Sequence, residues 1–176
     1  MTETELKAKA MLISQKREKR ENPIFFMKDL LELTEMLFAS GRRDEAEEAF
    51  SEVAETYFHH GIESMIMHHV YSDFGFADRI LALSDALCGT ESEVSFAVIY
   101  YRAIDLVDSG NRVDETAVYE EALAELNLRK KGYVEEKLKI YRRYTSALRR
   151  SGRVDEARKY EDSLFQFKQD NIWPLD

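Results

Sequence analysis

The densest group of chemically active side chains is a run of basic residues in the last third of the chain. Its members recur at helical spacing and are Lys139, Arg142, Arg143, Arg149 and Arg150. On a helix this spacing gathers the cations into one stripe, with an opposing packed side made of Leu138, Tyr141, Thr145 and Leu148. Arginine holds carboxylates through paired hydrogen bonds, so the stripe predicts contact with an acidic partner. Two alternatives are a solvated helix face and pairing with acidic helices earlier in the chain.

The four histidines form a second group that could do chemistry, since they lie close together at His59, His60, His68 and His69. Histidine clusters bind zinc or copper, and they also titrate near neutral pH. No two of them have the four-residue spacing of a metal motif on one helix, and no cysteine is near in sequence. We therefore expect packed or exposed histidines at a hairpin turn, and we assign no metal or other cofactor.

No catalytic motif accompanies these groups. The sequence has no nucleophile elbow, no phosphate-binding glycine loop and no zinc signature. Its many Asp and Glu side chains lie mainly on amphipathic faces, where solubility explains them. We therefore expect a protein that binds a partner and is not an enzyme.

A repeated phrase sets the elements that must position the basic stripe. Ser-Gly-Arg-x-Asp-Glu-Ala occurs at 40–46 and 151–157, and a stretched copy, SGNRVDET, occurs at 109–116. Glycine allows a left-handed residue to end one helix, and the following aspartate suits the first turn of the next helix, as its cap or as a favourable charge. The phrase therefore predicts helical hairpins. The predicted turns lie at Gly41, Gly75, Gly110 and Gly152.

The spacing of these glycines carries a family resemblance. Gly41 to Gly75 is 34 residues, Gly75 to Gly110 is 35 and Gly110 to Gly152 is 42. The tetratricopeptide repeat (TPR) has a 34-residue period of helix, turn and helix. The alanine that the family has five residues after the turn glycine is matched by Ala46 and Ala157, and by Thr116 after a one-residue slip, but not by Ile80. The chain thus resembles the TPR family, with degenerate repeats that lack its tryptophan and closing proline.

The resemblance implies an all-α fold in which antiparallel helical hairpins stack as a right-handed superhelix. We expect one domain over residues 1–176, with an extra N-terminal helix at 2–21, hairpins over 24–169 and a tail at 170–176. The four hairpins are expected at 24–40 with 44–58, 62–73 with 77–88, 92–108 with 114–127, and 133–150 with 155–169. Trp173 in the tail is expected to cover the last hairpin or to contact another subunit.

The resemblance also implies a binding surface, because TPR proteins usually bind extended peptides on their concave side. The partner-binding residues in this register are Leu31, Glu35, Phe38, Met65, His69, Tyr100, Tyr101, Lys139, Arg142, Arg143 and Arg149. Lys28, Glu32, Ile66 and Ile104 lie along the same groove. Such a groove suits a peptide with hydrophobic anchors and an acidic end. The carboxylate clamp of chaperone-binding members is missing, because Leu31 and Glu35 stand at its lysine and asparagine positions.

Charge is divided unevenly along the chain. Residues 21–127 carry 23 acidic and 6 basic side chains, whereas residues 128–159 carry 4 acidic and 12 basic ones. The acidic body argues against broad phosphate binding, although the basic final repeat and the run at 16–20 keep a nucleic-acid-associated accessory protein as an alternative. A self-assembling structural subunit is a third hypothesis, and a protein-binding adaptor scaffold is the first. One cysteine and no transmembrane-length or signal-like segment favour a cytoplasmic protein without a membrane contact.

Overall fold

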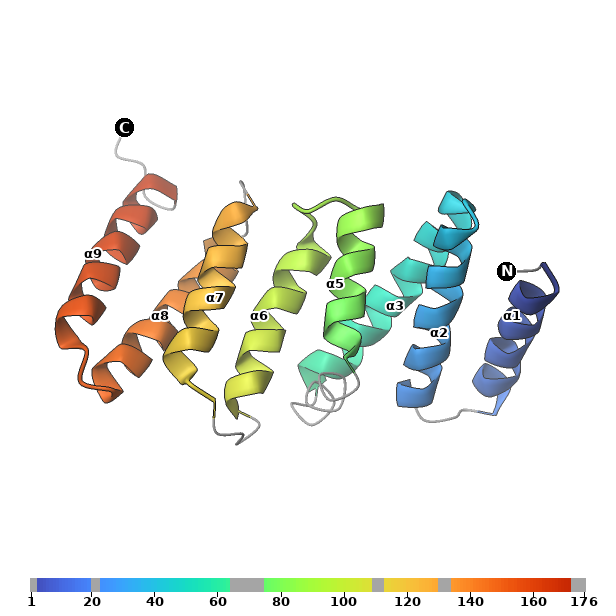
Figure 1. Ribbon diagram of the computed structural model, residues 1–176, viewed down its shortest axis with the longest axis horizontal. Coiled ribbons are helices and arrows are strands. Elements are labelled where there is room, and N and C mark those ends of the chain that lie inside the picture. Colours follow the sequence, from blue (N-terminus) through green and yellow to red (C-terminus); the bar gives the residue numbers. More distant parts are fainter. Residues whose placement is uncertain (1–2, 20–22, 64–74, 109–112, 130–133, 172–176) are drawn as a thin grey trace. The chain divides into compact units, whose positions relative to one another are not determined.

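The computed structural model describes residues 3–19, 23–63, 75–108, 113–129 and 134–171, and these parts consist of helices and short turns (Figure 1). The predicted all-α fold class is therefore confirmed. The chain divides into two compact units, residues 1–98 and 99–176. The single domain and the right-handed superhelix stay predictions.

The helices are bounded as follows. The first unit contains α1 (Glu3–Glu18), α2 (Pro23–Ala39), α3 (Arg43–Glu63), α5 (Phe76–Leu87) and the start of α6 (Glu93–Asp108). The second unit contains the rest of α6 with α7 (Glu115–Leu128), α8 (Val134–Arg150) and α9 (Val154–Asn171). These bounds confirm the predicted N-terminal helix and the first, third and last pairs of helices, with shifts of a few residues at their ends.

The second predicted hairpin is wrong at its start. α3 continues without a break to Glu63, whereas the prediction ended this helix at Phe58 and began another at Ile62. Gly61 lies inside α3, because glycine costs a helix only about 1 kcal/mol relative to alanine and does not by itself end it. Most of 62–73 lies outside the described residues, while α5 packs directly against both α2 and α3.

The two full copies of the repeated phrase fold into the same turn. Gly41 ends α2 with φ 77° and Gly152 ends α8 with φ 81°, as predicted. In each copy the arginine after the glycine donates its backbone N–H to a leucine carbonyl five residues earlier, at 3.1 and 2.8 Å. The serine before the glycine donates its hydroxyl to the same carbonyl, at 2.8 and 2.9 Å. These bonds satisfy carbonyls that a helix end leaves open.

The other predicted turn residues have mixed outcomes. Gly75 has φ 66° and directly precedes α5, whereas Gly110 lies outside the described residues. Asp44 and Asp155 lie in the first turns of α3 and α9, where their charge is favourable. In the stretched copy, Asp114 caps α7 by accepting hydrogen bonds from the backbone of the next helical turn, at 3.0 and 3.4 Å.

Each unit has its own apolar core between its helices. In the first unit, Ala46 is fully buried, and large side chains of α2 and α3 are buried as well, among them Leu30, Phe50 and Tyr57. In the second unit, Ala157 is equally buried, and the aromatic core comes mainly from α7 and α8. Tyr144 of α8 meets Tyr160 of α9 edge-on at a centroid distance of 4.7 Å. Small residues thus allow close approach of the helices at the seam that follows each phrase.

Candidate partner-binding surfaces

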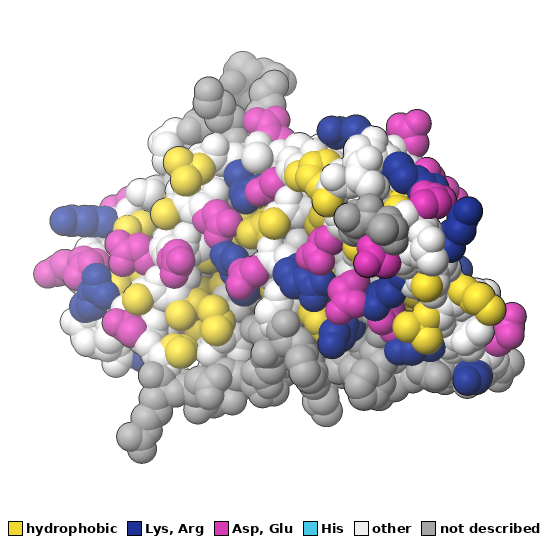
Figure 2. Space-filling model, turned by 45° about the vertical axis from the view of Figure 1, so that its right-hand side comes forward, with side chains coloured by type: hydrophobic (Ala, Val, Ile, Leu, Met, Phe, Trp, Pro, Cys, Tyr) yellow, Lys and Arg dark blue, Asp and Glu magenta, His cyan; other side chains and the backbone are white. Residues whose placement is uncertain are grey.

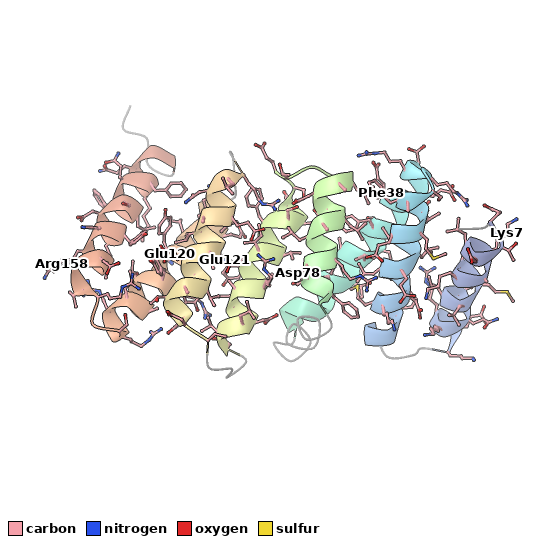
Figure 3. The ribbon with its side chains drawn as sticks, in the orientation of Figure 1. Lys7, Phe38, Asp78, Glu120, Glu121 and Arg158 are labelled. Carbon is pink, nitrogen blue, oxygen red and sulfur yellow. The ribbon has the colours of Figure 1, made fainter. Side chains whose placement is uncertain are left out.

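A shallow groove of the first unit lies between α2 and α5. Phe38, near the end of α2, keeps 38% of its surface exposed beside this groove. The volume of the groove is about 390 Å³, and Figure 3 labels Phe38 on α2 and Asp78 on α5. The lining consists of Glu35, Phe38, Asp78, Arg79, Ala82, Leu83 and Ala86. Two of the residues expected from the sequence, Glu35 and Phe38, therefore meet at one surface.

An ion pair links the two walls of this groove. Arg79 of α5 donates two hydrogen bonds to the carboxylate of Glu35, at 2.8 and 2.7 Å. These bonds raise the pKa of Arg79 above its usual value, and both side chains stay partly exposed. A ligand in the groove would meet a fixed charged pair at one side and the apolar surface of Phe38 and Ala82 at the other.

A cluster of two tyrosines and a lysine forms a surface of the second unit. Tyr100 and Tyr101 of α6 meet edge-on, with ring centroids 5.1 Å apart. The ammonium of Lys139, on α8, lies 5.6 Å from the centroid of the Tyr100 ring, which is within the range of a cation–π contact. Burial, more than any other cause, raises the pKa of Tyr101 above its usual value, so its hydroxyl stays protonated. All three side chains are partly exposed, as a contact surface requires.

The basic stripe on α8 is divided among several partners. Arg143 approaches Asp108 of α6 at 3.5 Å, and Arg150 pairs with Glu115 of α7. Arg149 holds Glu161 of α9 through two hydrogen bonds, of 2.9 and 2.7 Å. Arg142 is exposed and forms no ion pair with any described residue. Pairing with acidic helices earlier in the chain therefore accounts for Arg143 and Arg150, whereas Arg149 pairs with the helix that follows α8 and Arg142 lies outside these pairs.

Two positions of the predicted groove belong to the core instead. Leu31 has no exposed surface and Ile104 keeps only 7% of its surface, so neither can contact a partner. α2 is covered by α1, α3 and α5, and this covering buries more of its circumference than the repeat register implies. The predictions for Met65, Ile66 and His69 lie outside the described residues, as do those for the other histidine side chains and for Trp173.

The sequence did not reveal the second wall of the groove on α5. Ala82 and Ala86 are four residues apart and both exposed, beside the buried Leu83. Residues four apart are neighbours on a helix surface, so these two small side chains lie on the same side of α5. Within the described residues, no group of His, Cys, Asp and Glu is arranged to hold a metal ion.

A buried carboxyl group gives α6 an unusual electrostatic feature. Asp105 keeps only 6% of its surface exposed. Burial raises the pKa of Asp105 to about 7, and the charge of nearby Asp108 contributes to this rise as the smaller cause. The group therefore changes its charge near neutral pH.

Comparison with known proteins identifies only structural similarities. No family model matches the sequence, and no curated protein matches it. Among solved structures, BtubC (BKLC) from P. vanneervenii is similar with 14% identity and a TM-score of 0.44, over 96% of this chain and 74% of that one. A Podosopora anserina putative kinesin light chain with nearly identical TPR-like repeats is similar with 12% identity and a TM-score of 0.38, over 95% and 87% of the two chains.

A membrane-spanning helix is not found among the described residues.

The fold assignment rests on the chain's own helices and turns. The matched turns at Gly41 and Gly152 join paired helices, α2 with α3 and α8 with α9, so the described parts are built from helical hairpins.

Proposed function

We propose that the protein is a non-enzymatic adaptor that binds a partner protein or peptide on the surfaces of its helical hairpins. The observation that carries the proposal is the exposed Phe38 beside the groove between α2 and α5. Aromatic side chains bury a large area at low entropy cost, so a half-exposed phenylalanine at a groove is suited to anchor a ligand. The proposal retains the sequence-based expectation of a cytoplasmic protein.

The chemistry of the surfaces favours a peptide with apolar anchors and an acidic segment. The groove of the first unit offers Phe38, Ala82 and Ala86 to an apolar side chain. In the second unit, Arg142 offers an exposed guanidinium that no described carboxylate holds, on the same helix as Lys139 of the tyrosine cluster. Arginine binds carboxylates with two hydrogen bonds. A nucleic-acid ligand gains no support, because three cations of the stripe already hold acidic side chains of the protein.

The test is selection of binding peptides on the full chain, followed by two substitutions with matched controls. Ala82→Arg fills the groove, and Ala124→Arg places the same side chain at an exposed site of α7. Arg142→Glu reverses the exposed cation, and Arg158→Glu reverses an exposed arginine that points away from α8 in Figure 3. We expect Ala82→Arg to weaken binding of the peptides that carry apolar anchors and Arg142→Glu to weaken binding of the acidic peptides, each by about tenfold or more, while the controls bind as the wild type.

Equal binding by all four variants would refute the proposed surfaces, provided that far-UV circular dichroism shows them folded. If the selected peptides lack acidic residues and bind the Arg142→Glu variant as tightly as the wild type, the basic stripe has no part in binding. The groove between α2 and α5 would then remain as the proposed site.

A further inference from the structure

The N-terminal helix α1 has the same place in the first unit as α7 has in the second. α1 packs against α2, and α7 packs against α8, next to the matched turns (Figure 1). In both units the arginine of the repeated phrase reaches this preceding helix. Arg42 Nη1 lies 3.2 Å from Glu3 Oε2 of α1, and Arg153 Nη1 lies 3.1 Å from Thr116 Oγ1 of α7. These contacts align Glu3 with Thr116.

The alignment also matches the buried side of the two helices. Leu6 of α1 corresponds to Tyr119 of α7, and Ile13 corresponds to Leu126. All four of these side chains are buried. α1 therefore occupies the surface that a preceding repeat would cover.

The contact between α1 and α2 differs from the contact between α7 and α8 in one pair of facing positions. Where α7 has the buried Ala122, α1 has Lys9. Where α8 has the fully buried Ile140, the matched position of α2 is Asp29, which keeps only 6% of its surface exposed. At these positions the contact between α7 and α8 is apolar, whereas the matching contact between α1 and α2 is ionic.

The ionic seam joins α1 to α2 through matched charges. The ammonium of Lys9 lies 2.6 Å from one carboxylate oxygen of Asp29, and that of Lys16 lies 2.5 Å from the other. Lys9 also pairs with Glu32. Burial is the largest single influence on the pKa of Asp29 and would raise it, but these two hydrogen bonds together hold the pKa below its ordinary value.

The rest of the contact surface of α1 contains another ion pair and a cavity. Arg17 pairs with Glu52 of α3, and a cavity of about 370 Å³ lies along the seam, with Leu33 and Leu37 in its lining. Basic and acidic side chains interleave on the face shown in Figure 2. Only Leu6 and Ile13 of α1 are buried among its described residues. Ion pairs in such a seam fix which helix fits, but they contribute less net stability than apolar packing, because their desolvation offsets the attraction.

We propose that the α2–α3 face beneath α1 is a docking site for a basic amphipathic helix of another protein, and that α1 is its replaceable intramolecular occupant. Charge complementarity identifies the partner's chemistry. Once α1 is displaced, Asp29, Glu32 and Glu52 remain on a face that also carries Leu33 and Leu37. The partner helix carries two apolar residues seven positions apart, each followed by a lysine three positions later, as in Leu6, Lys9, Ile13 and Lys16. The proposal goes beyond the Phe38 groove and does not depend on it.

The probe for this site is a fluorescein-labelled peptide of residues 2–20, titrated against the full chain by fluorescence anisotropy. In the wild type, the tethered α1 competes at a high effective concentration, so binding is weak. Lys9→Glu with Lys16→Glu releases α1 and leaves the acidic face intact. We expect this variant to bind the peptide at least about tenfold more tightly than the wild type does. A peptide of the same composition in scrambled order should bind neither protein.

Two further variants are matched to the released one. Lys19→Glu with Lys159→Glu makes the same charge change at exposed positions that do not line the cavity under α1. This control should bind the peptide as weakly as the wild type. Lys9→Ala with Asp29→Ile reproduces the apolar pair of the second unit, so α1 should stay in place and peptide binding should be lost. Peptide affinity should also fall when KCl is raised from about 0.05 M to about 0.5 M.

Unchanged peptide affinity in a folded released variant would overturn the proposal. A wild-type dimer by light scattering that dissociates when residues 2–20 are deleted would overturn it in favour of α1 from a second copy. If the Lys9→Glu, Lys16→Glu variant does not fold, amide hydrogen exchange of the wild type tests whether α1 detaches from α2 and α3. Amides of α1 should then exchange at least about tenfold faster than those of α2, and equal protection would refute the proposal.

Discussion

Replacing Asp105 with asparagine should stabilise the protein above neutral pH and change its stability little in acid. Burial raises the pKa of Asp105 to about 7 in the folded chain, whereas an unfolded aspartate titrates near 3.9. Between these values the folded state holds a proton that the unfolded state has lost. The favourable contribution of the buried neutral carboxyl is therefore fully present below about pH 4 and is lost as the pH rises to about 7.

The size of the effect follows from the difference between the two pKa values. About three units correspond to about 4 kcal/mol at most, and relaxation around the charge reduces this to about 2–4 kcal/mol. The amide of the Asp105→Asn variant carries no charge to bury, so the variant should exceed the wild type in stability by this amount near pH 8. At about pH 4.5 the two proteins should agree within about 1 kcal/mol.

The assay is urea unfolding followed by circular dichroism, at about pH 4.5 and about pH 8. Glu121→Gln, at an exposed position of α7 labelled in Figure 3, is the control and should match the wild type at both values. If Asp105→Asn destabilises the protein equally at both pH values, the carboxylate is held ionised by a partner, and the reasoning from burial is refuted.

Three predictions on stability concern the glycines and the cap of these helices. Gly41→Ala and Gly152→Ala should each lower the free energy of unfolding by about 1–2 kcal/mol, because both glycines have a positive φ, which strains an L-alanine. The added methyl meets open space at both sites, so unequal costs in urea unfolding would contradict the matched geometry of the two turns. Gly61→Ala should raise the free energy of unfolding by up to about 1 kcal/mol, measured by thermal unfolding, and a loss would place Gly61 outside regular helix. Asp114→Ala should cost about 1 kcal/mol by removing the cap of α7, whereas Asp114→Asn should largely retain it.

The ends of most helices could be predicted from the sequence because their signals are local. A glycine that ends a helix and an aspartate that begins the next act through bonds within a few residues, as at Gly152 and Asp114. Gly61 shows the limit of this reasoning, since glycine is compatible with both a turn and a helix interior. Only the continued helical backbone of α3 distinguishes the two cases.

The binding surface could be predicted only in part because burial depends on neighbours that are distant in sequence. Phe38 and Leu31 lie on the same helix, yet one is partly exposed and the other is fully buried, because α2 is covered from several sides. The spacing of the arginines predicted one stripe on α8. It could not predict that Glu161 and Glu115 would hold Arg149 and Arg150 from two different helices.

The arginine of the repeated phrase explains why the phrase specifies more than a turn. Its backbone N–H closes the helix end, and its guanidinium holds the glutamate three residues later, as in Arg153 with Glu156 at 2.9 and 2.6 Å. The remaining nitrogen reaches the preceding helix, on Thr116 in one unit and on Glu3 in the other. One residue, through its backbone and its side chain, therefore connects three successive helices. A lysine at this position would keep the charge but lose the fork of donors, so the packing of α1 or α7 against the turn requires arginine.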